Sequence, residues 1–304
     1  MQISPDGFIS LSWSDLSCLW TCPRKFYFSK LLHLSKKTTF EDTPMYALEF
    51  GKAMHKIREL RGRGTPFSEI EDLIRPTFED EPSGLRTSGN LFRYAQKLED
   101  LAPKLSTLQT EWGWKFPLVE GVELRGILDE VAKDEQGEVY LIELKTTSRR
   151  GGLNFKAAST NQQFGIYCLA ATSLLHTPPI GYYLIEISLL KTAGTAKVPW
   201  ESVINWDKFP PMPLKPLLAH LEAIALSLRR RIKWMGMGGR WGMKNFLPHS
   251  TGCTNYNHLC PYAPICEMEP TQFHLEEWDD MYEVKEHHRD AKFNALPSPS
   301  TFLA

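Results

Sequence analysis

Two acids and a lysine lie near the ends of two consecutive apolar segments. Asp129 follows Gly126-Ile127-Leu128, and Glu143 and Lys145 flank Leu144 in the next segment. Paired carboxylates repel each other unless a cation lies between them, and Mg²⁺ and Mn²⁺ bind carboxylate, carbonyl and water oxygens. A lysine beside such an ion can hold or deprotonate a metal-bound water and stabilise charge on a phosphoryl oxygen. The residues therefore indicate a metal site for phosphate chemistry, although an exposed ion pair of little consequence would look the same.

The elements that must position these residues are two β-strands joined by a short loop. Residues 122–134 and 138–147 are rich in Val, Ile, Leu and Tyr. The loop Glu135-Gln136-Gly137 suits a three-residue hairpin with glycine in the left-handed position. A preceding strand is expected over residues 110–119, which predicts three consecutive antiparallel strands.

The loop also predicts the register of the hairpin. If Asp134 faces Glu138, counting back along both strands sets Asp129 opposite Glu143. Opposed residues share one face of a sheet, and Lys145 lies two residues beyond Glu143, on the same face. Asp129, Glu143 and Lys145 then converge, whereas a turn shifted by one residue would separate them.

Asp129 followed by Glu143-Leu144-Lys145 resembles the catalytic core of the PD-(D/E)XK nuclease superfamily. Leu128 stands where the family name has proline, a position that is loosely kept in the superfamily. The resemblance implies that Asp129, Glu143 and the Leu144 carbonyl hold Mg²⁺ or Mn²⁺, that Lys145 assists the attacking water, and that DNA is the substrate. It also implies an α/β fold with a restriction-endonuclease-like core, a mixed β-sheet flanked by helices.

Two further pairs of residues resemble the RecB-like branch of this superfamily. His55 follows Gly51 by four positions in an expected helix, where a lone histidine is ordinarily a satisfied core or surface group. The Gly-x-x-x-His helix of RecB-like nucleases implies that His55 is a metal ligand through its neutral imidazole. Gln163 and Tyr167 lie four apart in a helix expected over residues 155–175, and composition alone suggests ordinary packing. They resemble the Gln-x-x-x-Tyr motif of the same branch, which helps to position DNA and the active site.

Three cysteines near the C-terminus, Cys253, Cys260 and Cys266, look like thiolate ligands of a metal centre. Proline follows Cys260, and iron-sulfur sites often place proline beside a ligand. A fourth ligand is missing locally. Cys22, also followed by proline, can supply it if the two ends of the chain meet, and Cys18, one helical turn earlier, is a rival.

This set of cysteines resembles that of the iron-sulfur nucleases of the AddB type and of the CRISPR-associated exonucleases. The resemblance implies a structural [4Fe-4S] cluster held by one early and three late cysteines. Six residues separate Cys253 from Cys260, however, where two are usual. That difference leaves zinc open, with His249 or His258 able to complete a tetrahedral site.

The chain is expected to form a single nuclease domain over residues 1–268, followed by an acidic helix at 275–287 and a tail, together residues 269–304. Within the domain we expect an N-terminal cluster-binding segment, a helical region, a catalytic sheet with its helix, and a helix followed by the C-terminal cysteine segment. Their residues are 1–34, 45–107, 108–191 and 211–268.

Bulk composition constrains the partners only weakly. The 304 residues carry 35 Lys and Arg against 36 Asp and Glu, a formal charge of −1, so any nucleic-acid surface must be local. We see neither an apolar run long enough to span a bilayer nor a signal-peptide pattern at the start, so we expect a soluble cytoplasmic protein without a membrane partner. Six cysteines in a reducing compartment indicate metal ligands or free thiols rather than disulfides.

Taken together, the residues and the resemblance predict a Mg²⁺- or Mn²⁺-dependent deoxyribonuclease, an exonuclease rather than an endonuclease. Repair, recombination, phage replication and CRISPR adaptation all use such domains, and a helicase or other DNA-processing proteins are the partners that these roles imply. The alternative is a catalytically silent subunit that keeps the nuclease fold and binds DNA or acts as a scaffold within a larger complex.

Overall fold

The described residues of the computed structural model fall into two compact units. The first comprises residues 1–42, 115–126 and 218–298, and the second comprises residues 43–114, 127–217 and 299–304. Strands β4 (Ser106–Val119) and β5 (Val122–Lys133) contribute residues to both. The structure describes residues 1–3, 7–37, 46–78, 88–147, 160–189, 202–236, 246–248, 253–255, 258–266, 275–284 and 294–303.

A mixed sheet forms the centre of the second unit. Strand β5 pairs antiparallel with β6 (Val139–Thr147), which pairs parallel with β7 (Gly181–Leu189), and β7 pairs antiparallel with β8 (Ser202–Phe209). Strand β4 pairs with β5. The inner strands β6 and β7 each begin with an apolar run, as expected where both faces of a sheet are covered. The expected α/β architecture, a mixed sheet flanked by helices, is confirmed.

The hairpin between β5 and β6 has the predicted loop and register. Gly137 has a φ of 82°, and the Asp134 amide donates to the Glu138 carbonyl at 3.0 Å. The paired residues continue from there to Glu130 opposite Ile142. The turn chemistry alone was sufficient to predict this register because glycine is favoured at the left-handed position.

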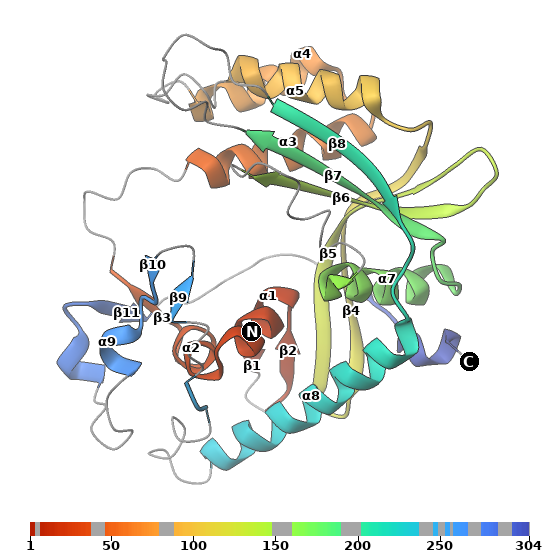
Figure 1. Ribbon diagram of the computed structural model, residues 1–304. Coiled ribbons are helices and arrows are strands. Elements are labelled where there is room, and N and C mark those ends of the chain that lie inside the picture. Colours follow the sequence, from red (N-terminus) through yellow and green to blue (C-terminus); the bar gives the residue numbers. More distant parts are fainter. Residues whose placement is uncertain are drawn as a thin grey trace. The chain divides into compact units, whose positions relative to one another are not determined.

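Helices cover both faces of this sheet (Figure 1). Helices α3 (Tyr46–Gly62), α4 (Phe67–Ile74) and α5 (Ser88–Leu101) lie over one face, and α7 (Gln162–Leu175) lies against the other. Helix α5 ends at Leu101 because Pro103 disfavours the helical conformation of the residue before it. The core on the α3 face contains Phe50, Met54, Ile57, Ile70, Leu91, Tyr94, Leu98, Ile142, Leu144, Ile185 and Ile187.

The first unit contains both the N-terminal helices and the C-terminal cysteine segment. Ser12 caps α1 (Trp13–Thr21) in a capping box with Asp15, as expected for a helix that begins after a serine. The unit further contains β1 (Gln2–Ile3), β2 (Ile9–Leu11), α2 (Pro23–Phe26), the π-helix Tyr27–Leu31, β3 (Leu34–Lys36), β9 (Thr254–Asn255), β10 (His258–Leu259), α9 (Ala263–Cys266), β11 (Tyr282–Val284) and β12 (Asn294–Ala295).

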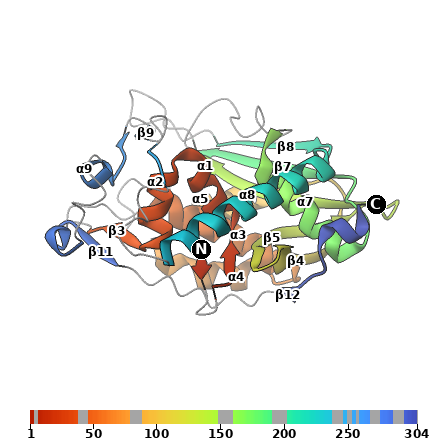
Figure 2. The same cartoon turned by 90° about the horizontal axis from the view of Figure 1, so that it is seen from below.

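Helix α8 (Leu214–Gly236) is the longest helix in the described part of the chain. From Leu218 onward it belongs to the first unit, where it runs beside α1 (Figure 2). The His220 ring of α8 stacks on the Trp20 ring of α1 at 6.1 Å. Within the part of the chain that the structure describes, no helix combines the length and the apolar composition needed to cross a membrane.

The prediction of an acidic helix at residues 275–287 is wrong for the part of this segment that the structure describes. Leu275–Trp278 form a short 3₁₀ helix, and Tyr282–Val284 form strand β11, which pairs antiparallel with β3. Tyrosine and valine favour strands, and pairing with β3 overrides the weak helical propensity of the neighbouring acids.

Candidate metal centre and active site

Asp129 lies one residue beyond the Glu130–Ile142 pair, and its side chain reaches across to β6. Its Oδ2 accepts a hydrogen bond from the Leu144 amide at 3.0 Å. The register of the hairpin, continued by one residue, sets Asp129 beside Glu143. The two acids that the sequence analysis paired are therefore neighbours on adjacent strands.

Glu143 is almost completely buried and receives hydrogen bonds from two side chains. It is 3% exposed, and its Oε1 accepts from Lys145 Nζ and, at 3.1 Å, from Gln163 Nε2. Gln163 Nε2 also donates to the Tyr167 hydroxyl at 2.9 Å. The structure thus brings Glu143, Lys145, Gln163 and Tyr167 together in one hydrogen-bonded group.

The start of α7 positions Gln163 and Tyr167 in this group. The Asn161 side chain accepts from the Gln163 amide at 2.9 Å and begins the helix there, so that Gln163 and Tyr167 lie one turn apart on the face toward β6. The Tyr167 ring packs edge-on against Trp114 at 6.4 Å. Of the helix expected at 155–175, residues 155–159 lie outside the described part of the chain.

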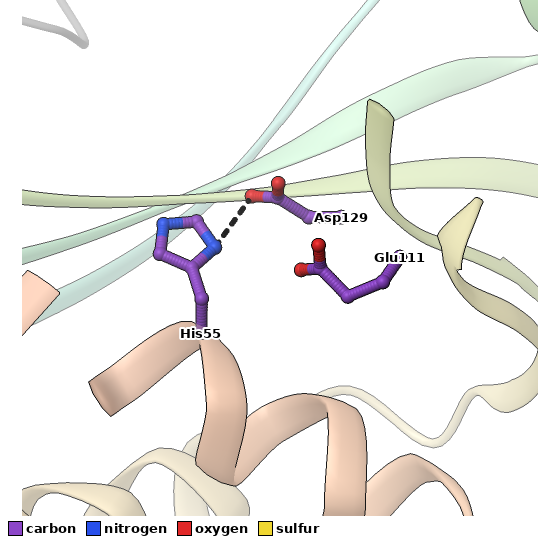
Figure 3. A group of neighbouring side chains, drawn as sticks. All are labelled: His55, Glu111 and Asp129. Carbon is purple, nitrogen blue, oxygen red and sulfur yellow. Dashed lines mark ion pairs between the residues drawn. The ribbon is translucent and has the colours of Figure 1, made fainter. Parts of the chain in front are cut away.

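His55 and Glu111 approach Asp129 from two other elements (Figure 3). His55 Nδ1, on α3, lies 3.3 Å from Asp129 Oδ2. One possible ligand atom each from His55, Glu111 and Asp129 lies within 4.8 Å of the others. Gly51 lets α3 come this close to β6, because a Cβ there would meet Thr146 Oγ1 at 3.0 Å. The three side chains together form a possible site for a metal ion.

Two small pockets lie at Asp129. One is lined by Glu143, Phe164, Tyr167 and other residues on the α7 side, and the other by His55, Glu59, Glu111 and other residues on the α3 side. Asp129 lines both pockets, so a single carboxylate borders both groups of side chains.

Comparison with family models identifies the class of protein to which the chain belongs. The model of the PD-(D/E)XK nuclease superfamily matches residues 10–267. The chain belongs to this superfamily. The PD-(D/E)XK fold is that of metal-dependent nucleases, which typically use Mg²⁺ or Mn²⁺ and for which DNA is the expected substrate, as the resemblance in the sequence implied.

The remaining comparisons add little to the superfamily assignment. No curated protein matches the chain. Among solved structures, the chain is similar to the crystal structure of SSO0001 at 14% identity and a TM-score of 0.28, over 66% of this chain and 84% of that one.

The charges of this candidate site suit a divalent cation. Burial raises the pKa of Asp129 to about 6, and burial together with the charge of Asp129 raises that of Glu143 to about 7. Burial, with neighbouring carboxylates, likewise raises the pKa of Glu111 to about 7. Burial lowers the pKa of His55, which favours the neutral imidazole that binds metals. Clustered oxygens that resist ionisation in the metal-free protein, next to a neutral imidazole, are a fitting ligand set for Mg²⁺ or Mn²⁺.

Lys145 is held as a cation within this candidate site. Burial acts to lower the pKa of its ammonium, but the charges of Glu143 and Asp129 outweigh burial and raise that pKa above its usual value. The Lys145 side chain is 29% exposed, and its ammonium group is paired with Glu143.

Glu111 is the member of the candidate metal site that the sequence analysis missed. It lies within β4 with a φ of 44°, a left-handed backbone conformation that residues other than glycine, asparagine and aspartate seldom adopt. Nothing in the alternation of β4 predicts such a break. The only signal in the sequence is a single acid in the aromatic-rich strand Thr110 to Val119.

The cysteines expected to bind a cluster lie in the first unit, on segments that contact one another. The Cys22 thiol caps α2 by accepting from the Lys25 amide at 3.4 Å, and Arg24 Nη1 donates to the Cys266 carbonyl at 2.7 Å. The Cys260 amide donates to the Cys253 carbonyl at 2.7 Å. The N-terminal helix and the C-terminal cysteine segment therefore meet within this unit.

The structure does not bring three or more of the described cysteine thiols together as metal ligands. Among the described residues, the only group of three or more His, Cys, Asp or Glu ligand atoms within 4.8 Å of one another is that of His55, Glu111 and Asp129. Sulfurs bound to zinc at about 2.3 Å in a tetrahedron would lie roughly 3.8 Å apart. Cys18, His249 and His258 were the alternative ligands expected from the sequence. The Cys18 thiol contacts Ser29 Oγ at 3.6 Å. His249 and the side chain of His258 lie outside the described part of the chain.

Proposed function

We propose that this protein is a Mg²⁺- or Mn²⁺-dependent deoxyribonuclease of the RecB-like branch that degrades DNA from its ends. The observation that carries the proposal is the position of Asp129. Its Oδ2 is 3.0 Å from the Leu144 amide and 3.3 Å from His55 Nδ1, so this one carboxylate touches both the Glu143 strand and the His55 helix.

In this proposal Asp129, Glu143 and the Leu144 carbonyl hold one ion. His55 and Glu111, together with the shared Asp129, provide ligands for a second ion on the α3 side. Glu111 is added here to the ligands that were expected from the sequence. When bound, such ions lower the pKa of water and polarise a phosphoryl oxygen. The burial of Glu143 supports the proposal. Its Oε1 accepts from Lys145 and Gln163, and of these two partners only Lys145 carries a positive charge that can balance the carboxylate.

Lys145 acts as a cation that stabilises charge on the scissile phosphate. Its raised pKa keeps the ammonium protonated at neutral pH, and it can donate a proton or a hydrogen bond to an oxygen that gains charge. Glu143 holds this ammonium in place before substrate binds.

Gln163 and Tyr167 orient the Glu143 carboxylate. Because Gln163 donates both to Glu143 and to the Tyr167 hydroxyl, the amide cannot rotate without losing one of these hydrogen bonds. The same two residues, with Gly51 and His55, carry the resemblance to the RecB-like branch, and that resemblance is the basis for proposing exonuclease action. A role in DNA repair, recombination, phage replication or CRISPR adaptation, beside a helicase or other processing protein, follows from it.

In the first unit we propose that Cys22, Cys253, Cys260 and Cys266 hold a structural [4Fe-4S] cluster, with zinc as the alternative. Support comes from the Arg24 hydrogen bond to the Cys266 carbonyl and from two tyrosines that hold the cysteine segment. The Tyr262 hydroxyl donates to the Leu34 carbonyl, and the Tyr282 hydroxyl donates to the Pro261 carbonyl, both at 2.6 Å. A metal clip of this kind closes a loop of more than two hundred residues and stabilises it by restricting the unfolded chain.

Digestion of end-labelled linear DNA and of closed circular DNA, each as single strand and as duplex, tests the proposed activity. With Mn²⁺ we expect label to be released from the linear forms while the circles remain intact, and EDTA should stop the reaction. Cleavage of circles would replace the exonuclease assignment with an endonuclease one. DNA binding without any cleavage, in protein that binds Mn²⁺, would favour the silent scaffold subunit.

A further inference from the structure

Glu130, the residue after Asp129, is buried and fully engaged by two other elements. Its side chain is 4% exposed, Oε2 lies 2.7 Å from Arg58 Nη2 of α3, and Oε1 accepts from the Thr107 hydroxyl of β4 at 2.6 Å. Both acids contact α3, Glu130 through Arg58 and Asp129 through His55, and Asp129 also accepts from the Leu144 amide of β6.

We call His55, Glu111 and Asp129 the metal group. The partners of Glu130 are close in sequence to His55 and Glu111. Arg58 lies one helical turn after His55 on α3, and Thr107 lies four residues before Glu111 on β4. The three members of the network therefore come from the same three elements as His55, Glu111 and Asp129 (Figure 3).

A close approach of α3 to β4 accompanies this network. Gly62, the last residue of α3, has no side chain, and a Cβ there would lie 2.8 Å from Thr110 Cγ2 and 3.4 Å from Thr107 Cγ2. The end of α3 is thus packed directly on the segment of β4 that leads to Glu111.

We propose that Arg58, Glu130 and Thr107 are positioning residues that set the spacing of His55, Glu111 and Asp129 for metal binding. The proposal rests on the proposed function. A buried ion pair adds little net stability compared with apolar packing, because desolvation offsets its attraction, but it fixes geometry through directional hydrogen bonds. Groups that orient metal ligands typically change metal affinity by about tenfold or more when they are removed.

Isothermal titration of the metal-free protein with Mn²⁺ tests this role, using Glu130→Gln and Thr107→Val. We expect each substitution to weaken Mn²⁺ binding about tenfold. Activity on linear DNA should return when Mn²⁺ is raised, with the KM for DNA unchanged. Thr107→Ser keeps the hydroxyl and should keep the affinity of the unaltered protein.

Glu99→Gln is the matched control. Arg61, one turn after Arg58 on α3, pairs with Glu99 at 2.6 Å and 3.0 Å. The control therefore removes a more exposed ion pair of the same helix that does not involve the metal group. It should leave Mn²⁺ affinity unchanged, whatever its effect on the melting temperature.

Three outcomes separate this proposal from the function on which it rests. Weaker Mn²⁺ binding in Glu130→Gln and Thr107→Val, but not in Glu99→Gln or Thr107→Ser, supports it. A lower melting temperature with unchanged Mn²⁺ affinity in the first two overturns it while the nuclease assignment stands. Unaltered protein that neither binds Mn²⁺ nor cuts DNA overturns both.

Discussion

The Leu144 amide donates a 3.0 Å hydrogen bond to Asp129 Oδ2, so a side chain of β5 takes the place of a backbone acceptor for β6. This contact fixes Asp129 one residue beyond the last backbone pair and next to Glu143. The Leu144 carbonyl belongs to the same residue and is therefore positioned by the same contact. The ligand set proposed for the metal is thus organised largely by the hairpin itself.

Replacing Lys145 with methionine should remove its charge while keeping most of its volume. We expect kcat for Mn²⁺-dependent DNA cleavage to fall by about 10²–10³-fold, because a preorganised cation no longer stabilises the phosphate charge. Mn²⁺ affinity should be unchanged or higher, because the ammonium competes for Glu143. Lys133→Met, an exposed position on β5, is the control and should cleave normally. Equal loss of Mn²⁺ binding and cleavage in Lys145→Met would contradict this role.

Stability of the metal-free protein should fall as pH rises from about 4.5 to about 7. Burial first, and then the charge of Asp129, raises the pKa of Glu143 from 4.5 to about 7, so in this window the folded state holds a proton that the unfolded chain releases. With fewer protons bound in the unfolded state, the free energy of unfolding decreases with pH.

Melting curves in EDTA at several pH values, compared with those of Glu143→Gln, measure this dependence, because the substitution removes the titrating group and leaves the others. The difference between the two proteins should change with pH in the stated direction. Mn²⁺ should stabilise the unaltered protein more at pH 8 than at pH 6, since protons compete with the ion for the carboxylates. A difference that does not vary between pH 4.5 and 7 would show that Glu143 ionises normally.

Glu111→Asn should stabilise the metal-free protein and weaken metal binding. The φ of 44° at Glu111 is strained for glutamate and better tolerated by asparagine, which we expect to raise the free energy of unfolding by about 1 kcal/mol. Urea unfolding and Mn²⁺ titration of the same protein measure both effects.

His176→Asn is the control for Glu111→Asn. His176 has a φ of 61° at the end of α7, the end opposite Gln163, so relief of strain there should stabilise the protein without changing Mn²⁺ affinity. If Glu111→Asn binds Mn²⁺ as tightly as the unaltered protein, Glu111 is not a ligand.

Protein purified without oxygen should be brown, with broad visible absorption from the cluster. Cys260→Ser should lose most of this absorption and its iron, whereas Cys168→Ala, which alters a buried thiol of α7 in the second unit, should keep both. Metal analysis alongside the spectrum distinguishes the alternatives. Colourless protein with one equivalent of zinc would rule out the iron-sulfur cluster.

Local chemistry explains which parts of the fold and site were predictable from the sequence. The Glu135-Gln136-Gly137 loop predicted a register that the structure confirms, because a glycine at φ 82° permits few alternatives. The four-residue spacing of Gln163 and Tyr167 likewise placed both on one face of α7, where they now form a hydrogen bond.

Features that depend on distant pairing were not predictable. Strand β8 was not expected, because its pairing with β7 rather than its own composition makes it a strand. Tyr282–Val284 were expected to be helical but pair with β3 instead. Glu111 joins the metal group only through a left-handed residue within β4, and the Arg58–Glu130 pair joins α3 to β5 across 72 positions of sequence.

The central claim is that Asp129 is the shared carboxylate of a metal-dependent nuclease, and Asp129→Asn tests it most directly. The measurement is Mn²⁺-dependent release of label from end-labelled linear DNA, with Asp100→Asn, an exposed position on α5, as the control. We predict that Asp129→Asn melts within a few degrees of the unaltered protein but releases no label above background, while Asp100→Asn is fully active. Undiminished release by folded Asp129→Asn would contradict the assignment.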